Sequence, residues 1–273
     1  MHHDGLRFSS AKRGDHNEVD DFVQGKGQYT SDIDLSEQLY ACFVRSPHAS
    51  AVIRKIDSKV ALAIPGVKLV LTGEDLAKAG VGQIMPMAIF NGIDGKPMTQ
   101  AGIPVLAYPQ VRYVGEAVVA VAAETLDIAR AAVAAIHVTY EELPTLFDPH
   151  EAMKDGAVQL HDFAQNNICK HTRIRKGDVD AALAQADIIV EQTYNTQSIE
   201  HAYLEPEAGL AYLEADGCVT VQSPSQNITH HRHMLARILG RPINKVRMIM
   251  STVGGGFGGK EDMIYQGMLA LAA

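Results

Sequence analysis

The sequence predicts an α+β fold, in which short strands alternate irregularly with a few helices. Short apolar runs rich in β-branched residues recur along the chain, and alanine-rich or amphipathic stretches of helical spacing separate some of them. The composition agrees, because 273 residues with 47% hydrophobic and 21% charged residues can bury one large or two ordinary domains. An intrinsically disordered or fibrous chain is therefore excluded.

The first half is predicted to be rich in strands after a polar leading arm, residues 1–24. Pro47 stops the first strand, and Asp57 can cap a short helix that Pro65 and Gly66 end. Residues 80–109 are rich in Gly, Pro and Met, which predicts a long excursion on the surface or across an interface. We expect strands at residues 39–46, 51–56, 67–72, 111–114, 117–123 and 136–140, and helices at 58–64 and 125–135.

Acidic residues and two prolines at residues 141–149 predict a domain boundary. We therefore expect a leading arm at 1–24, one domain at 25–150 and a second, incomplete domain at 151–273. The last predicted helix is strongly apolar and stops without a polar tail, which suggests a fragment or one half of a split subunit. In the second domain we expect strands at 187–196, 209–213, 219–222 and 246–250, and helices from Asp178 or Asp180 to Ala186, at 227–239 and at 262–273.

Charge and cysteine content exclude several classes of function. The 24 basic and 32 acidic residues give a net charge of -8, and the basic residues are scattered, so nucleic acid is a poor partner. No apolar run approaches the roughly 18 residues that a membrane span needs. The start lacks the apolar core of a signal peptide, and with three widely spaced cysteines we expect a cytoplasmic protein.

Neither the cysteines nor the histidines predict a metal site. Without a C-x-x-C pair, Cys42, Cys169 and Cys218 are expected to be buried, reduced thiols rather than iron–sulfur or zinc ligands. His230, His231 and His233 lack the i, i+4 spacing of a zinc pair on one helix face. We interpret them as a partly exposed helix face.

Residues 254–261, Gly-Gly-Gly-Phe-Gly-Gly-Lys-Glu, are the main candidate for a binding site. Five glycines in six positions remove side chains where backbone approaches a ligand, and their N–H groups can point into one concavity. This pattern predicts an anionic, bulky ligand. The alternative is a glycine-rich connection between a strand and a helix that binds no ligand.

Two nucleotide patterns also match this loop in part. Gly254-x-Gly256-x-x-Gly259 fits the dinucleotide fingerprint, but it lies at the end of the chain instead of after the first strand. Gly254-x-x-x-x-Gly259-Lys260 fits most of the phosphate-loop pattern, but Glu261 stands where a Ser or Thr hydroxyl should bind magnesium. A glycine-loop nucleotide-binding module remains one alternative, and an inactive interaction fragment is another.

Residues 254–261 resemble the molybdopterin-binding loop of the molybdenum hydroxylases, the family of xanthine dehydrogenase, aldehyde oxidase and aerobic carbon monoxide dehydrogenase large subunits. Segments 200–206 and 223–226 resemble the beginning of that family's cofactor domain. Further segments resemble, in order and spacing, its amino-terminal hammerhead α/β domain: 27–33, 43–49, 65–67, 111–118 and 138–144.

The resemblance implies an α+β hammerhead domain followed by the first part of a mixed α/β molybdopterin-binding domain. It implies the molybdenum-cofactor subunit of an oxidoreductase that hydroxylates an aldehyde or N-heterocycle with water as the oxygen source. Molybdenum would be held by the pterin dithiolene near Phe257, with no protein side chain as metal ligand. Gly255, Gly256, Phe257 and Gly258 would bind the cofactor, and Glu261 would be catalytic, facing the substrate.

The same resemblance implies that other polypeptides complete the enzyme. The family's general-base glutamate lies in a later portion, and Ile199 stands where xanthine-oxidising members commonly carry Gln. The cofactor is molybdenum-molybdopterin, either alone or as a cytosine dinucleotide. Expected partners are the remainder of the molybdopterin subunit, an iron–sulfur subunit with [2Fe–2S] clusters and an FAD subunit, with a small aromatic heterocycle or aldehyde as substrate.

Overall fold

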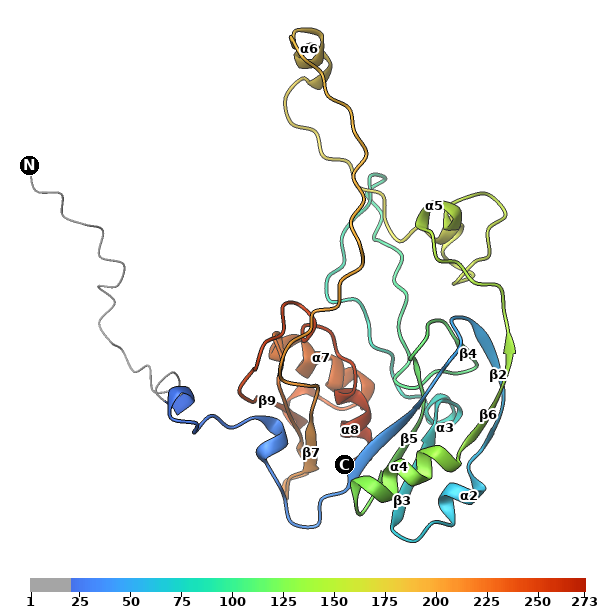
Figure 1. The fold of residues 1–273 in the computed structure, drawn as a ribbon, viewed down its shortest axis with the longest axis vertical. Helices are drawn as coiled ribbons and strands as arrows, with labels where there is room; N and C mark the ends of the chain where they lie inside the picture. The colour runs from blue at the N-terminus through green and yellow to red at the C-terminus, as the bar shows by residue number, and fades with distance from the viewer. Residues whose placement is uncertain (1–20) are drawn as a thin grey trace, which may run out of the picture.

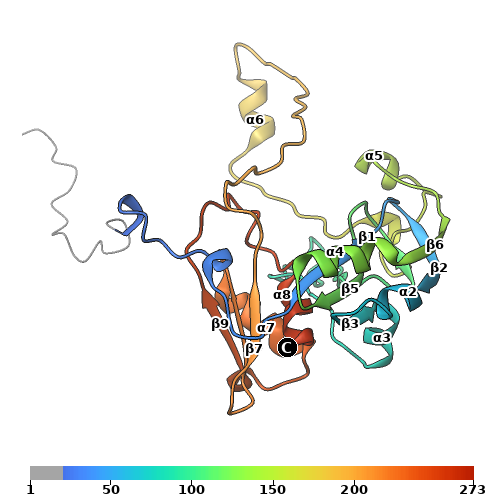
Figure 2. The same cartoon turned by 60° about the horizontal axis from the view of Figure 1, so that its bottom comes forward.

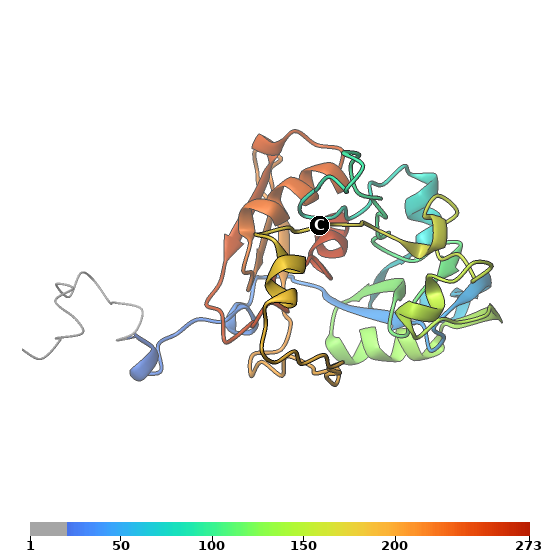
Figure 3. The ribbon, with the colours of Figure 1, turned by 90° about the horizontal axis from the view of Figure 1, so that it is seen from above.

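The protein, described here from a computed structural model over residues 21–273, has two sheet-containing halves that lie side by side (Figures 1 and 3). The predicted arm at residues 1–24 falls almost wholly outside the described residues. The elements of the first half are η1 (Thr30–Asp32), β1 (Tyr40–Arg45), β2 (Ala51–Asp57), α2 (Lys59–Leu62), β3 (Val67–Thr72), α3 (Gly73–Lys78), β4 (Gln110–Val111), β5 (Ala117–Ala123), α4 (Leu126–Ala135), β6 (His137–Glu142) and α5 (Pro149–Ala152).

The first half contains two antiparallel sheets with strand orders β1-β5-β3 and β4-β2-β6. β5 is apolar at every position and becomes the central strand of its sheet, almost entirely buried between β1 and β3. Helix α4 begins at the Thr125 cap, whose hydroxyl accepts the N–H of Ile128. Because its small residues Ala129 and Ala132 are buried, α4 packs closely on β1 and β5.

The second half contains one mixed sheet, which lies beside the first half. Its elements are η2 (Gln165–Asn167), α6 (Val179–Ala184), β7 (Leu210–Leu213), β8 (Val219–Ser223), α7 (Ile228–Ile238), η3 (Ile243–Lys245), β9 (Val246–Met250) and α8 (Gln266–Ala272). Strand β8 pairs with β7 in antiparallel and with β9 in parallel orientation, so β8, α7 and β9 form a strand–helix–strand crossover. α7 lies beside β9, while α8 lies beside β7 and β8 (Figure 2).

One hydrophobic core joins the two halves. It combines Leu76, Leu106 and Ala120 of the first half with buried residues of β8, α7 and α8, such as Val221 and Leu235. The predicted excursion at 80–109 contains no named strand or helix and crosses this interface, where the Gly82 N–H donates to the Ile238 carbonyl. The first half also has a smaller core of its own. No helix within residues 21–273 is long and apolar enough to cross a membrane.

Several predicted elements need correction. The strand expected at 187–196 does not form, because no described strand pairs with it. The strand expected at 111–114 is shorter and ends at Val111 as β4. The Glu116 carboxylate accepts the Arg112 N–H at 2.6 Å, and the chain turns there. The helix expected at 262–273 begins at Gln266, whose side chain accepts the N–H groups of the two preceding residues.

Two short helices were not predicted although the sequence carries their caps. Thr72 and Asp75 form a capping box at the start of α3, with each side chain accepting a backbone N–H from the other residue. The Asp148 carboxylate caps α5, and Pro149 occupies its first turn. The cap of α3 lies at the end of the strand predicted at 67–72. The cap of α5 lies in the domain boundary predicted at 141–149.

Candidate functional site

The glycine loop, residues 251–261, connects β9 to the turn before α8. Its entry is fixed at Ser251, whose N–H donates to the Ser223 carbonyl at the end of β8. The buried hydroxyls of Thr30 and Ser251 are 2.7 Å apart, which ties the loop to η1. The loop therefore starts from a defined position at the end of two parallel strands.

The Gln226 side chain supports the central part of the loop. Its Oε1 atom accepts the N–H of Gly258 at 2.9 Å and the N–H of Lys260 at 3.2 Å. The backbone N–H of Gln226 donates to the Lys260 carbonyl at 3.0 Å. A Cβ atom at Gly256 would lie 2.4 Å from Gln226 Oε1, so a side chain at Gly256 would displace this support.

A buried ion pair supports both ends of the loop. Lys260 Nζ lies 2.6 Å from Glu205 Oε2 and donates to the Glu205 carbonyl at 3.0 Å. The same Oε2 atom accepts the Gly254 N–H at 2.7 Å, and the Lys260 ammonium lies 4.6 Å from the ring centroid of Tyr203. The side chains of Lys260 and Glu205 are 0% and 8% exposed. Lys260 is therefore a buried salt-bridge partner of Glu205 and not a surface cation.

The predicted cofactor-binding residues lie at the tip of the loop. Gly255 and Gly258 have φ of +95° and +94°, and Phe257 has φ of +51°, which is unusual for a residue with a side chain. The Phe257 side chain is 76% exposed. Within residues 21–273, the N–H groups of Gly255, Gly256 and Phe257 have no hydrogen-bond acceptor. Three successive backbone N–H groups are therefore unpaired among the described residues, while the Gly258 N–H is held by Gln226.

The predicted catalytic residue Glu261 lies half-buried after the tip. Its N–H donates to the Gly258 carbonyl, and its carbonyl lies 2.9 Å from His231 Nε2. Because a carbonyl only accepts, His231 Nε2 carries the proton, and Nδ1 accepts from the Ser225 hydroxyl 3.0 Å away. No described residue hydrogen-bonds to the Glu261 carboxylate, so it is free to meet a ligand. Sequence reasoning missed the role of His231, which is completely buried instead of partly exposed.

The His231 contact makes stability depend on pH. Burial holds the pKa of His231 below its ordinary value, although the Glu261 carbonyl opposes the shift. The unfolded state therefore binds more protons below about pH 6.5, so this contribution to stability is present above that pH and is lost as the pH falls. In urea unfolding from pH 7.5 to 5, we expect His231→Gln to lose stability less steeply than the wild type. His233→Gln, an exposed change on the same helix, should retain the wild-type slope; equal slopes in all three would contradict the assignment.

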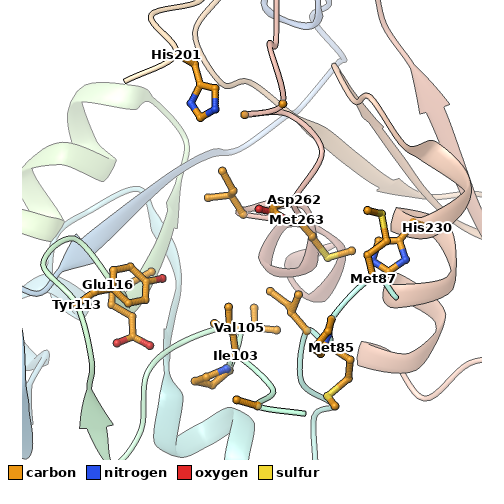
Figure 4. A pocket seen from close by; sticks show the side chains of 18 of the residues that line it. Met85, Met87, Ile103, Val105, Tyr113, Glu116, His201, His230, Asp262 and Met263 are labelled. Carbon is orange, nitrogen blue, oxygen red and sulfur yellow. The ribbon is translucent and has the colours of Figure 1, made fainter. Parts of the chain in front are cut away.

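Beside the loop lies a cavity of about 590 Å³ between the two halves (Figure 4). His201 and Gly258 of the second half line it, together with Tyr113 and Glu116 of the first half. Burial raises the pKa of Glu116, against the opposing hydrogen bond from the Arg112 N–H. Glu261 does not line this cavity, whereas its neighbour Asp262 does. Glu116 is visible in the sequence as an acid directly before a wholly apolar strand, but this local pattern does not show that its carboxylate lines a cavity.

No metal site of protein side chains is found in the part of the chain that the structure describes: it holds no group of three or more His, Cys, Asp or Glu placed to bind an ion. The three cysteines are free, but only Cys218 is buried; Cys42 is half-buried and Cys169 is exposed. The expectation of three buried thiols was therefore wrong for two of them, because Cys169 lies in the exposed stretch beyond η2.

Two family models together match most of the chain. Residues 24–144 match the aldehyde oxidase and xanthine dehydrogenase a/b hammerhead domain, and residues 160–273 match the molybdopterin cofactor-binding domain. The chain is 36% identical over 254 residues to the nicotinate dehydrogenase large molybdopterin subunit of Eubacterium barkeri, covering 91% of this chain and 55% of that protein. It is 30% identical to the xanthine dehydrogenase molybdenum-binding subunit of Escherichia coli O157:H7, covering 91% of this chain and 32% of that one.

The fold has the same relatives among solved structures. The aldehyde oxidoreductase from Desulfovibrio gigas superimposes with a TM-score of 0.80 at 26% identity, covering 93% of this chain and 28% of that one. A hammerhead domain followed by the start of a molybdopterin-binding domain defines the class of protein. The chain belongs to the molybdenum hydroxylase family and corresponds to part of its molybdenum-cofactor subunit. The chain spans about half the length of the nicotinate dehydrogenase subunit and about a third of the length of the other two relatives.

Proposed function

We propose that this chain supplies one wall of the active site in a molybdenum-dependent oxidoreductase that hydroxylates an N-heterocycle or an aldehyde. The observation that carries the proposal is the row of backbone donors at Gly255, Gly256 and Phe257, which have no acceptor within residues 21–273. They stand on a support built by Gln226 and by the Glu205–Lys260 ion pair. Such fixed donors favour a bulky ligand with oxygen and sulfur acceptors over an empty loop.

The residues present fit molybdenum-molybdopterin. Gly255, Gly256, Phe257 and Gly258 would hold it through their backbone, since glycines at φ near +95° let the chain approach closely without a Cβ atom. The cofactor in bound form, alone or as a cytosine dinucleotide, supplies a two-electron oxidation at carbon with water as the oxygen source. The protein would supply shape, hydrogen bonds and charge, and no side chain of this chain would bind the metal.

Glu261 is proposed to act on the substrate. Its backbone is fixed by Gly258 and His231, while its carboxylate has no hydrogen-bond partner among the described residues. A carboxylate held in this way can orient a ring nitrogen or stabilise charge that develops on it in the transition state. Nicotinate and xanthine, named for two relatives, are both N-heterocycles, and this favours an N-heterocycle over an aldehyde.

Partners are proposed to complete the enzyme. The relatives are about two to three times longer, so the remainder of the molybdopterin subunit would cover the opposite side of the cofactor. Three scattered cysteines cannot hold two [2Fe–2S] clusters, which need four ligands each, so an iron–sulfur subunit would hold them. An FAD subunit is proposed from the family resemblance alone. Free cysteines also fit the reducing cytoplasm as its location.

Metal analysis tests the proposal. The 273-residue chain purified alone is expected to hold no molybdenum and to oxidise neither aldehydes nor N-heterocycles, because it covers only part of the cofactor. The complex purified with its natural partners is expected to hold molybdenum and iron. Stoichiometric molybdenum in the isolated chain would contradict the need for partners. Bound nucleotide in the complex would instead support the nucleotide-binding alternative, and the lack of metal and nucleotide together would support an inactive interaction fragment.

A further inference from the structure

The part of the chain that reaches farthest from both cores is the projecting loop at residues 172–203, which carries α6 at its end (Figures 1 and 2). Its returning limb, residues 187–199, is called the outer segment here. It is exposed at every position and forms no strand with any described residue. The outer segment therefore leaves its backbone N–H and C=O groups to water.

The sequence of the outer segment is that of a half-buried strand. Ile188, Val190 and Tyr194 alternate with other residues, so in an extended chain they point to one face, and they are 82%, 79% and 79% exposed. The opposite face carries Ile189 and Ile199 and otherwise polar residues, among them Glu191 and Thr193. Apolar side chains this exposed, with β-branched residues and unpaired backbone, are typical of a strand that lacks its partner.

Both ends of the projecting loop are tied to the protein. Before the loop, the N–H groups of Ile93 and Thr99 donate to the carbonyls of His171 and Cys169. After it, the Glu205 N–H donates to the carbonyl of Gly254 in the glycine loop. The projecting loop therefore starts and ends at fixed points on the protein, and the outer segment lies between them.

The length of the relatives indicates what covers the outer segment. The chain spans 55% of the nicotinate dehydrogenase large molybdopterin subunit and 28% of the aldehyde oxidoreductase, so much of the molybdopterin subunit lies outside these 273 residues. We propose that residues 187–199 add as a β-strand to a sheet edge in that remaining part, whether it lies on the same or on a separate polypeptide. Ile188, Val190 and Tyr194 would pack into its core. The proposal rests on family membership and does not depend on the reaction.

This pairing would also reach the candidate site. The outer segment continues directly into His201 and Tyr203, which lie against Gly258 and Gly259 of the glycine loop. Fixing the outer segment would therefore fix two side chains that contact the loop. Assembly of the subunit would then both cover the candidate site and fix His201 and Tyr203 against the glycine loop.

Hydrogen–deuterium exchange tests the pairing directly. In the isolated chain we expect the amides of residues 187–199 to exchange at nearly the rate of unstructured peptide. In the subunit assembled with its remaining part we expect at least a hundredfold slower exchange. Unchanged fast exchange after assembly would overturn the proposal. So would protection that appears in the isolated chain and rises with its concentration, because the partner would then be a second copy.

A pair of charge substitutions tests which face is buried. Val190→Glu places a carboxylate on the apolar face, whereas Thr193→Glu places the same group on the polar face. Both positions are exposed, so neither variant should alter the circular dichroism of the isolated chain. Val190→Glu is expected to weaken assembly at least tenfold, and Thr193→Glu less than threefold. Equal effects of the two variants on assembly would overturn the assigned face and with it the proposed strand.

Discussion

Lys260→Met is expected to lower the free energy of unfolding of the chain by about 3–5 kcal/mol. Lys260 is completely enclosed, and its ammonium makes two contacts with Glu205, one to the carboxylate and one to the carbonyl. The Glu205 Oε1 atom already has no hydrogen-bond partner. Removing the ammonium would leave a buried carboxylate with only the Gly254 N–H to stabilise it. Urea unfolding followed by far-ultraviolet circular dichroism measures the loss.

A surface ion pair provides the matched control. Lys78 and Glu74 are spaced i, i+4 on α3, 2.8 Å apart and largely exposed. Lys78→Met is expected to change stability by less than about 1 kcal/mol, since exposed pairs contribute little. The double variant Lys260→Met with Glu205→Gln should regain part of the loss because no buried charge remains. Equal small effects of Lys260→Met and Lys78→Met would show that the buried pair does not support the loop.

Glu261→Gln in the assembled enzyme is expected to lower turnover a hundredfold or more while leaving the molybdenum content unchanged. The loss of one positioned charge that acts mainly on the transition state typically costs about 3 kcal/mol. The exchange of a carboxylate for an amide keeps the shape of the side chain, and the described contacts of Glu261 are made by its backbone. Steady-state kinetics and metal analysis on the same preparation measure both quantities.

Gly258→Val is expected to show the opposite pattern, with molybdenum lost together with activity. Gly258 has φ of +94°, which a β-branched residue cannot adopt without strain, and its neighbours on the loop are the proposed cofactor-binding residues. Gly156→Val is the control, because Gly156 has φ of +80° in open space far along the chain from the loop. Molybdenum loss in proportion to activity in Glu261→Gln would make its carboxylate structural. Full molybdenum content in Gly258→Val would remove residues 255–258 from the cofactor site.

Elements that depend on local sequence were predicted well. The strands at β1, β2, β3 and β5 and the helices α4 and α7 follow from apolar spacing and from caps within a few residues. The strand expected at 187–196 fails for the opposite reason, because a strand needs a partner and none lies within the described residues. Its apolar and β-branched residues follow the pattern of a strand, but such a pattern does not show whether a partner strand is present.

The glycine loop itself was predictable, but its support was not. Five glycines in six positions mark the loop in the sequence. The residues that fix it come from 32 to 55 positions away, since Glu205 and Gln226 reach Gly254, Gly258 and Lys260 only through tertiary packing. No local spacing distinguishes such a buried Lys–Glu pair from a surface pair.

The cavity between the halves illustrates the same limit. Glu116 and Tyr113 come from the first half, while His201 and Asp262 come from the second, so only the packing of the halves brings them together. The excursion at 80–109 was expected to lie on the surface or across an interface, and it lines this cavity through residues such as Met85. Its individual contacts have no signature in sequence.

The central claim is that residues 255–258 lie against the molybdenum cofactor. X-ray diffraction from crystals of the assembled enzyme, recorded above and below the molybdenum absorption edge, locates the metal independently of any activity. The account predicts one strong anomalous peak per molybdopterin subunit beside Phe257, with cofactor density against the N–H groups of Gly255, Gly256 and Phe257. A molybdenum peak remote from this loop, or nucleotide density in contact with it, would contradict the account.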